Sequence, residues 1–231
     1  MKISGFQKMT LLDFPGQVAA TVFTGGCNLR CPFCHNALLV TELNETEEYS
    51  EDFIISYLEK RRGVLDGLAI TGGEPLLQKD IRAFIERVRH LGYKVKLDTN
   101  GCYPDKLKDL VARNLVDYVA VDVKNSKERY AETVGVPGFS LEPVEETVSF
   151  LKKGLVPYEF RTTVVDEFHT LEDILKIGEW IDGADAWFLQ NFVDSGNLIG
   201  EDLHAAPREF LFAMREEGRK YVRKCELRGV D

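Results

Sequence analysis

Several features that would place this chain in a membrane or a secretory pathway are missing from its 231 residues. No run reaches the 18 apolar residues that a helix needs to span a bilayer. The first 17 residues lack the charged start and apolar stretch of a secretory signal peptide. The five cysteines are few and odd in number, which disfavours a disulfide framework. We therefore expect a cytoplasmic protein in a reducing compartment, without a membrane partner.

Positive charge is also scarce. The 29 lysines and arginines are outnumbered by 38 acidic residues, and the formal net charge is −9. A nucleic-acid partner is not expected, because such a partner requires a field of positive charge. What the sequence does contain is ordinary globular material, 44% hydrophobic, without repeats or linkers. A chain of this length can bury a full core as a single domain, residues 1–231.

Apolar segments typical of strands alternate with amphipathic segments typical of helices. The expected strands are residues 18–23, 67–71, 93–98, 118–122, 158–165 and 186–192, with 220–227 as a candidate edge strand. The expected helices are residues 51–62, 80–91, 104–113, 143–153, 170–181 and 207–217. This alternation predicts an α/β fold with parallel strands and outer helices. Because a closed eight-stranded barrel takes about 250 residues, six units predict a partial (β/α)6 barrel.

Within this fold we expect a core at about residues 18–195, then a C-terminal helix and the candidate edge strand within 200–231. The third strand has an unusual detail. Strict alternation places Lys94 and Lys96 on the same face as Asp98. This indicates either a bulge in the strand or a partly polar interior.

Polar motifs follow the ends of the expected strands, where the active sites of parallel sheets lie. In chain order they are residues 27–34, 71–75 (Thr-Gly-Gly-Glu-Pro), 98–101 (Asp-Thr-Asn-Gly) and 122–124 (Asp-Val-Lys), followed by Arg161 and Gln190. We expect these motifs to face one mouth of the barrel. Asn100-Gly101 by itself is interpreted as a turn.

Three of the five cysteines, Cys27, Cys31 and Cys34, fall within eight residues. Thiolates bind both zinc and iron–sulfur clusters. Structural zinc normally takes four protein ligands, and no second cysteine pair is present: Cys102 and Cys225 stand alone. The spacing favours a [4Fe–4S] cluster with one open iron over a zinc site or metal-free structural cysteines.

The cysteine motif, together with Gly72-Gly73-Glu74 after the second strand, resembles the radical S-adenosylmethionine (SAM) superfamily. The resemblance covers essentially the whole chain. Residues 34–36 (Cys-His-Asn), 97–101 and 122–124 are similar to activating enzymes of glycyl-radical enzymes. Residues 5–36 are similar to the short activating proteins of anaerobic ribonucleoside-triphosphate reductase. The Cys-rich insert of larger activating enzymes is absent, so the resemblance implies a single cluster.

The resemblance also implies roles for individual residues. Cys27, Cys31 and Cys34 would ligate three irons, and SAM would chelate the fourth. Gly72 and Gly73 would let the backbone approach the methionine end of SAM, and Glu74 would accept from its amino group. Lys124 and Arg161 would pair with its carboxylate, and Phe33 would lie near the adenine. Asp98, Thr99 and Asp122 resemble a monovalent-cation and SAM-carboxylate site.

The implied activity is that of a radical SAM oxidoreductase. One electron would cleave SAM to methionine and a 5′-deoxyadenosyl radical, which would abstract hydrogen from a glycine of a partner, expected to be anaerobic ribonucleoside-triphosphate reductase. An acidic flavodoxin or ferredoxin would supply the electron by docking on basic residues, either 60–62 or the run that includes Lys220 and Arg223. The alternative for that run is a solvated helix face. The open iron implies oxygen sensitivity and an anaerobic setting.

Two other functions stay open. A radical SAM enzyme acting on a small molecule, in cofactor or modified-base synthesis, would share the cluster and the SAM site. A zinc-binding or electron-transfer module would explain the cysteines but not the polar residues at the sheet edge. The short chain favours an open barrel face, and with it the activating enzyme.

Overall fold

The centre of the molecule is one sheet, seen in a computed structural model that describes residues 1–43 and 46–230. Its eight strands lie in the order β1 to β8, so each strand pairs with its neighbours in the sequence. β1 is antiparallel to β2, and every later pair is parallel. The strands are β1 (Ile3–Thr10), β2 (Ala19–Thr24), β3 (Gly67–Gly72), β4 (Lys94–Thr99), β5 (Tyr118–Asp122), β6 (Tyr158–Val164), β7 (Trp187–Asn191) and β8 (Cys225–Arg228).

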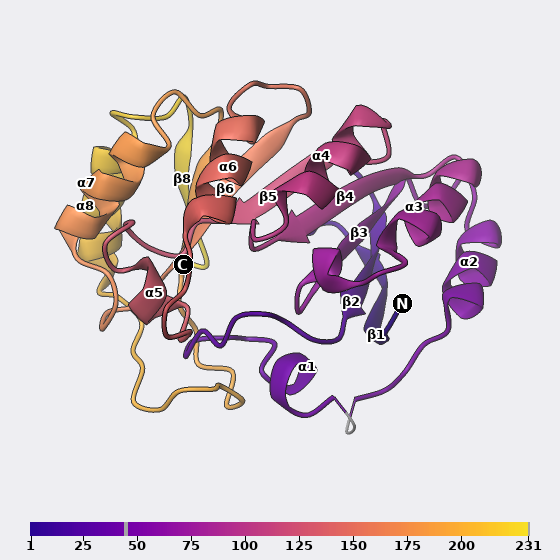
Figure 1. Cartoon of the computed structure of the whole chain (residues 1–231), viewed down its shortest axis with the longest axis horizontal. Helices are drawn as coiled ribbons and strands as arrows, with labels where there is room; N and C mark the ends of the chain where they lie inside the picture. Colours follow the sequence, from indigo (N-terminus) through magenta and orange to yellow (C-terminus); the bar gives the residue numbers. More distant parts are fainter. Residues whose placement is uncertain (44–45, 231) are drawn as a thin grey trace.

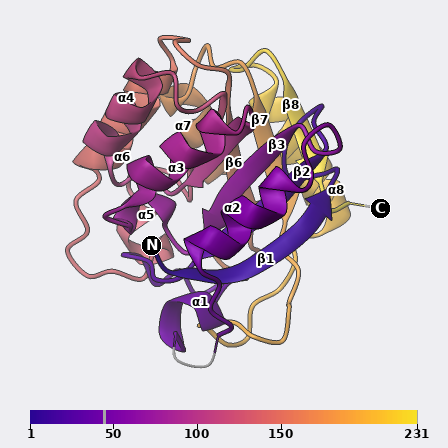
Figure 2. The same cartoon turned by 90° about the vertical axis from the view of Figure 1, so that its right-hand side faces the viewer.

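The long helices lie outside the curved sheet (Figure 1, Figure 2). α2 contacts α3, α4 contacts α6, and α7 contacts α8. In the described residues no helix combines the length and the hydrophobicity that crossing a membrane requires. The helices are α1 (Leu38–Thr41), α2 (Glu51–Glu59), the short 3₁₀ helix η1 (Pro75–Leu77), α3 (Ile81–His90), α4 (Pro104–Ala112), α5 (Tyr130–Thr133), α6 (Glu142–Leu151), α7 (Leu171–Trp180) and α8 (Arg208–Gly218).

The predicted α/β fold with parallel strands is confirmed, and the candidate edge strand is present as β8, parallel to β7. The prediction missed β1. Its sequence does not alternate cleanly, residues 7–9 are exposed in a row, and its pairing with β2 has register shifts, as is common at a sheet edge. No ladder joins β1 to β8 within the described ranges, so the sheet is open there, as a partial barrel requires.

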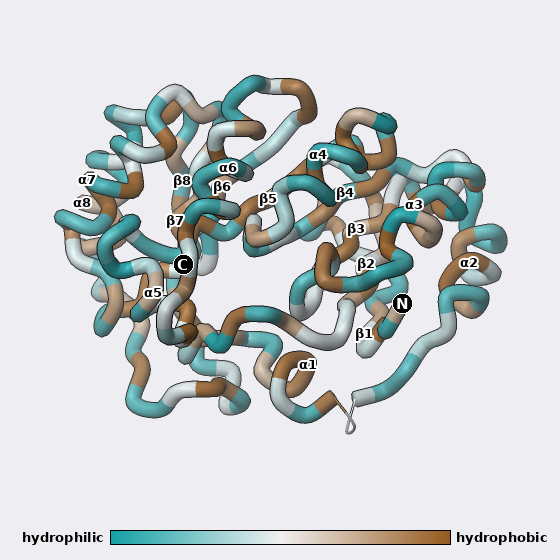
Figure 3. Tube along the Cα trace, in the orientation of Figure 1, coloured by the Kyte–Doolittle hydropathy of each residue, from teal (hydrophilic) through white to brown (hydrophobic). Residues whose placement is uncertain are grey.

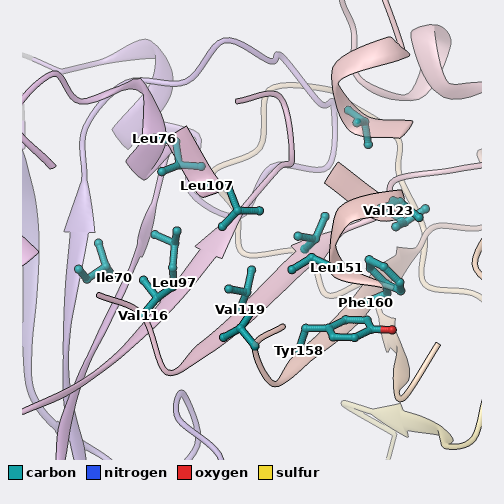
Figure 4. Packing of buried hydrophobic residues seen from close by; sticks show 14 of the residues in the cluster. Ile70, Leu76, Leu97, Leu107, Val116, Val119, Val123, Leu151, Tyr158 and Phe160 are labelled. Carbon is teal, nitrogen blue, oxygen red and sulfur yellow. The ribbon is translucent and has the colours of Figure 1, made fainter. Parts of the chain in front are cut away.

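A layer of apolar side chains joins the sheet to the helices (Figure 4). Ile70, Leu97 and Val119 are register partners on three adjacent strands, and all are fully buried. Leu107 of α4 and Leu151 of α6 pack over them (Figure 4). The helices show hydrophilic residues between hydrophobic ones, as expected when one face packs on a sheet and the other faces water (Figure 3).

The opposite face of the sheet is partly polar, and this resolves the unusual pattern of the third predicted strand. β4 pairs with β3 and β5 without a register shift, so the strand has no bulge. Lys96 is 2% exposed and forms an ion pair with Asp98 inside the curved sheet, whereas Lys94 is exposed at the strand start. Alternation along the strands therefore gives one apolar face and one charged face.

Candidate active site

A cavity of about 250 Å³ lies where the parallel strands end. It brings together every predicted site residue except Glu74: Phe33, Gly72, Gly73, Asp98, Thr99, Asp122, Lys124 and Arg161, with Cys27, Cys31 and Cys34. Its other lining residues include Asn100, Thr163 and Gln190. The predicted motifs therefore face one cavity at the carboxyl ends of the parallel strands.

The three cysteines occupy the loop after β2, and all are free thiols. Cys31 is 7% exposed, and Cys27 and Cys34 are half-buried. Burial raises the pKa of Cys31 to about 12 and also raises the pKa of Cys27 and Cys34. The metal-free loop therefore holds protonated thiols near neutral pH, and binding of a soft metal group would release those protons.

The donor set fits an iron–sulfur cluster. Three soft sulfur donors line one cavity, and thiolates are the ligands that hold [4Fe–4S] clusters in proteins. In the described residues, no three His, Cys, Asp or Glu side chains are grouped closely enough to share one metal ion. The fit therefore rests on the sulfur chemistry and on the shared cavity.

The Gly72-Gly73 turn lies directly against the cysteine loop. Gly72 has φ +110°, a conformation that favours glycine. A Cβ on Gly73 would lie 2.1 Å from the carbonyl oxygen of Gly26. Both glycines line the cavity, so a ligand can approach their main chain. The two glycines therefore serve two purposes. They allow the two loops to pack closely, and they leave the main chain accessible from the cavity.

The Glu74 side chain departs from its predicted role, because it is fully buried and does not line the cavity. Its Oε1 accepts hydrogen bonds from the main-chain N–H of Leu76 (2.9 Å) and the hydroxyl of Thr99 (2.8 Å). Its Oε2 accepts from the main-chain N–H of Asn100 (2.7 Å). The carboxyl group therefore joins the loops after β3 and β4 instead of facing the amino group of SAM.

This burial predicts a pH-dependent stability. Burial raises the pKa of Glu74 from 4.5 to about 7, against the opposing effect of its hydrogen bonds. A carboxyl with a raised folded-state pKa stabilises the fold fully below its unfolded pKa and loses that contribution as the pH rises through the folded value. Between about pH 5.5 and 7.5, the free energy of unfolding should fall by about 2 kcal/mol more in the wild type than in Glu74→Gln.

Urea titrations of the metal-free protein at several pH values would measure this difference. Glu128→Gln is the matched control, because Glu128 is exposed. It should keep the wild-type dependence on pH. A Glu74→Gln variant whose stability falls with pH as steeply as the wild type would contradict the prediction.

A chain of charges crosses the charged face of the sheet, in which Lys96 is buried and the other members are partly buried. Arg161 of β6 donates through Nη1 to Asp98 of β4 (2.8 Å) and through Nε to Asp122 of β5 (2.9 Å). Lys96 pairs with the second oxygen of Asp98, and Lys124 with the second oxygen of Asp122 (3.0 Å). Burial alone would raise the pKa of both aspartates, but Arg161 and the two lysines hold each below its usual range.

The predicted monovalent cation does not fit this chain of charges. All four carboxylate oxygens of Asp98 and Asp122 already have a cationic partner, and three basic side chains serve the two acids. A further cation would compete with these basic side chains for the same carboxylate oxygens. Among the charged residues that line the cavity, Lys124 and Arg161 balance Asp98 and Asp122, and Lys96 does not line it.

Two asparagines that contribute to the site were missed as functional residues. Asn36 donates through Nδ2 to the carbonyl oxygen of Gly72 (3.0 Å) and so holds the glycine turn. Asn100, interpreted from the sequence as part of a turn, lines the cavity and contacts the cysteine loop. The sequence signal that could have identified them is their position: Asn36 follows the cysteine motif, and Asn100 follows the end of a strand. Phe33 is buried, lines the cavity, and packs on Phe168 at a ring distance of 5.8 Å.

Comparisons with known proteins identify the family of the chain. The model of the family described as "Radical SAM superfamily" matches residues 21–181. A "Putative glycyl-radical enzyme activating enzyme" of Methanocaldococcus jannaschii is 32% identical over 239 residues, which covers 99% of this chain and 96% of the relative. A pyruvate formate-lyase-activating enzyme of Staphylococcus epidermidis is 27% identical over 78% of this chain and 74% of its own.

A 7-carboxy-7-deazaguanine synthase of Hyperthermus butylicus is 34% identical over 42% of this chain and 40% of its own. Among solved structures, Streptococcus suis SuiB bound to S-adenosylmethionine superposes with a TM-score of 0.63 over 88% of this chain and 45% of that one. Its identity of 14% makes this a likeness of fold.

Proposed function

This chain belongs to the radical SAM superfamily, whose enzymes use a [4Fe–4S] cluster and SAM, and we propose that it generates a glycyl radical on a partner enzyme. The observation that carries the proposal is the relative from Methanocaldococcus jannaschii, which matches along nearly the full length of both chains. Small-molecule enzymes match over less of this chain: the deazaguanine synthase over 42%, and a probable GTP 3',8-cyclase of Thermococcus kodakarensis over 62%. The activating enzyme is therefore the better-supported member of the two classes.

The residues around the cavity have distinct roles in this proposal. Cys27, Cys31 and Cys34 would hold the cluster. When bound and reduced, the cluster supplies the electron that cleaves SAM to methionine and a 5′-deoxyadenosyl radical. Lys124 and Arg161 would pair with the carboxylate of SAM. Both are kept in place by the aspartates beside them, because Asp122 pairs with both.

The remaining lining groups would position the rest of SAM. The main chain at Gly72 and Gly73 is open to the cavity and would approach the methionine end. Phe33 would lie near the adenine, and Thr99 is held at the cavity wall by Glu74. The radical would take a hydrogen atom from a glycine, giving 5′-deoxyadenosine and a glycyl radical. These groups position the reactants and exclude water.

The surroundings of the cavity suit a protein substrate. A second recess of about 400 Å³ shares His35 and Asn36 with the cavity and continues outward to Leu38, Ser195 and Asn197. In this proposal, a loop of a partner enzyme would approach the cavity from the side of this recess. The resemblance of residues 5–36 favours anaerobic ribonucleoside-triphosphate reductase as that partner.

The electron donor, flavodoxin or ferredoxin, also belongs to the proposal, as do an anaerobic setting and a cytoplasmic location. The structure gives such a donor less positive charge than the sequence indicates. Lys220 pairs with Glu217, Arg223 with Asp185, and Arg219 with Glu216 and Glu226. The basic side chains of this run are therefore paired with acidic neighbours, as on an ordinary solvated helix face. Because these pairs cancel much of the positive charge, long-range attraction of an acidic donor would be weak.

The test uses anaerobically reconstituted protein with SAM, reduced by dithionite or by flavodoxin. A candidate glycyl-radical protein is added, and 5′-deoxyadenosine and the EPR spectrum of the partner are measured. We expect 5′-deoxyadenosine in stoichiometric relation to a glycyl radical, and neither product with Cys31→Ala. Formation of 7-carboxy-7-deazaguanine from a small-molecule extract, without a radical on any glycyl-radical protein, would assign the chain to the second class.

A further inference from the structure

Asn100 makes more contacts than a turn residue needs. It follows β4, is 6% exposed and lies at the cavity wall. A turn at this point requires only that its Oδ1 accept from the main-chain N–H of Cys102, as it does at 3.0 Å. The other end of the side chain, Nδ2, reaches across to the cysteine loop. This second set of contacts has no part in forming the turn.

The Nδ2 group of Asn100 has two hydrogens and two acceptors. One acceptor is Oδ1 of Asn28 at 2.9 Å, and the other is the sulfur of Cys27 at 3.7 Å. The orientation of the amide is fixed by its neighbours. If it were reversed, an N–H group would face the N–H of Cys102 and an oxygen would face the sulfur.

The main chain of Asn100 is also held in place, by Glu74. Its main-chain N–H donates to Oε2 of Glu74 at 2.7 Å, and the other oxygen of Glu74 holds Thr99. Cys27 receives a second hydrogen bond, from the main-chain N–H of Leu29 at 3.4 Å. The Gly-Gly-Glu motif is thereby connected to Cys27 through one side chain.

We propose that Asn100 is a positioning residue that donates a hydrogen bond to the Cys27 sulfur and so raises the reduction potential of the cluster bound there. Hydrogen bonds to ligating sulfurs are one of the means by which proteins set cluster potentials. A donor stabilises negative charge on the sulfur, and the reduced cluster carries one more negative charge than the oxidised one. The donor therefore favours reduction. This inference rests on family membership and not on the identity of the substrate.

The decisive variant is Asn100→Ser. A serine hydroxyl can still accept from the N–H of Cys102 and preserve the turn, but it is too short to reach Cys27. On the holoenzyme without SAM, a redox titration followed by EPR should show a lower midpoint potential. The expected size is about a tenfold loss in the ratio of reduced to oxidised cluster at a fixed potential, or ~59 mV for one electron.

The matched control is Asn197→Ser, the same substitution at an exposed asparagine that does not line the cavity. It should leave the potential unchanged. A wild-type potential in Asn100→Ser would overturn the proposal, as would an equal shift in the control. If Asn100→Ser binds less iron, Asn100→Gln decides, because it keeps an N–H donor. Restored iron binding supports the proposal, and unrestored binding overturns it.

Discussion

Replacing Cys31 by alanine should abolish cluster assembly and lower the rate of SAM cleavage by about 10³-fold or more. Cys31 is the central cysteine of the motif and is buried within the loop that lines the cavity. Its loss leaves two thiols, which cannot hold three irons. Without a bound cluster no electron reaches SAM, so the enzyme loses its reaction and not merely its affinity for a ligand.

The measurements are iron and sulfide per chain, the visible absorption of the reconstituted protein, and 5′-deoxyadenosine after reduction. Cys225→Ala is the matched control, because Cys225 of β8 pairs with Trp187 of β7 and lies close to Gly218 of α8, far along the chain from the motif. It should retain iron and SAM cleavage. Full iron content and wild-type cleavage in Cys31→Ala would refute the ligand assignment, and stoichiometric zinc in the wild type would refute the cluster.

The architecture was accessible from the sequence because the parallel strands are buried and rich in apolar residues. Each of the six main strands appears where the pattern predicts it. β1 could not be found in this way, because an edge strand needs no apolar alternation. The sequence indicated a polar interior, because alternation placed Lys96 on the inner face of its strand. Only the structure shows which charged groups from the neighbouring strands complete the ion-pair network there. Asp98 accepts a hydrogen bond from Arg161, which lies on another strand and 63 residues away in the sequence.

The membership of the site was also predictable, but the contacts within it were not. Residues at the carboxyl ends of adjacent parallel strands must lie close together, whatever their types. Which groups a buried carboxyl contacts depends on the separate paths of several loops. Glu74 was therefore assigned to a ligand although its bonds go to Thr99 and Asn100, and Asn100 was assigned to a turn although it reaches Cys27.

Gly73→Ala should lower the free energy of unfolding by about 3 kcal/mol, at the upper end of the cost of overpacking. The added Cβ would lie 2.1 Å from the carbonyl oxygen and 2.7 Å from the carbonyl carbon of Gly26. Main chain cannot rotate away as a side chain can. Gly26 is itself held at both ends, since its N–H donates to Leu39 and its oxygen accepts from Glu74. The clash must therefore displace the cysteine loop as a unit, and iron binding should fall with stability.

Gly92→Ala separates this clash from the ordinary conformational cost of replacing a glycine. Gly92 has φ +91°, and no atom lies within 4 Å of the position of its Cβ. Its substitution should cost about 1 kcal/mol and leave iron binding intact. Urea unfolding of the metal-free proteins and iron per chain after reconstitution give both quantities. If Gly73→Ala matches Gly92→Ala in both stability and iron content, the glycine turn and the cysteine loop move independently. If only Gly73→Ala loses iron, the turn after β3 fixes the position of the loop that carries Cys27, and the two motifs act as one structural unit.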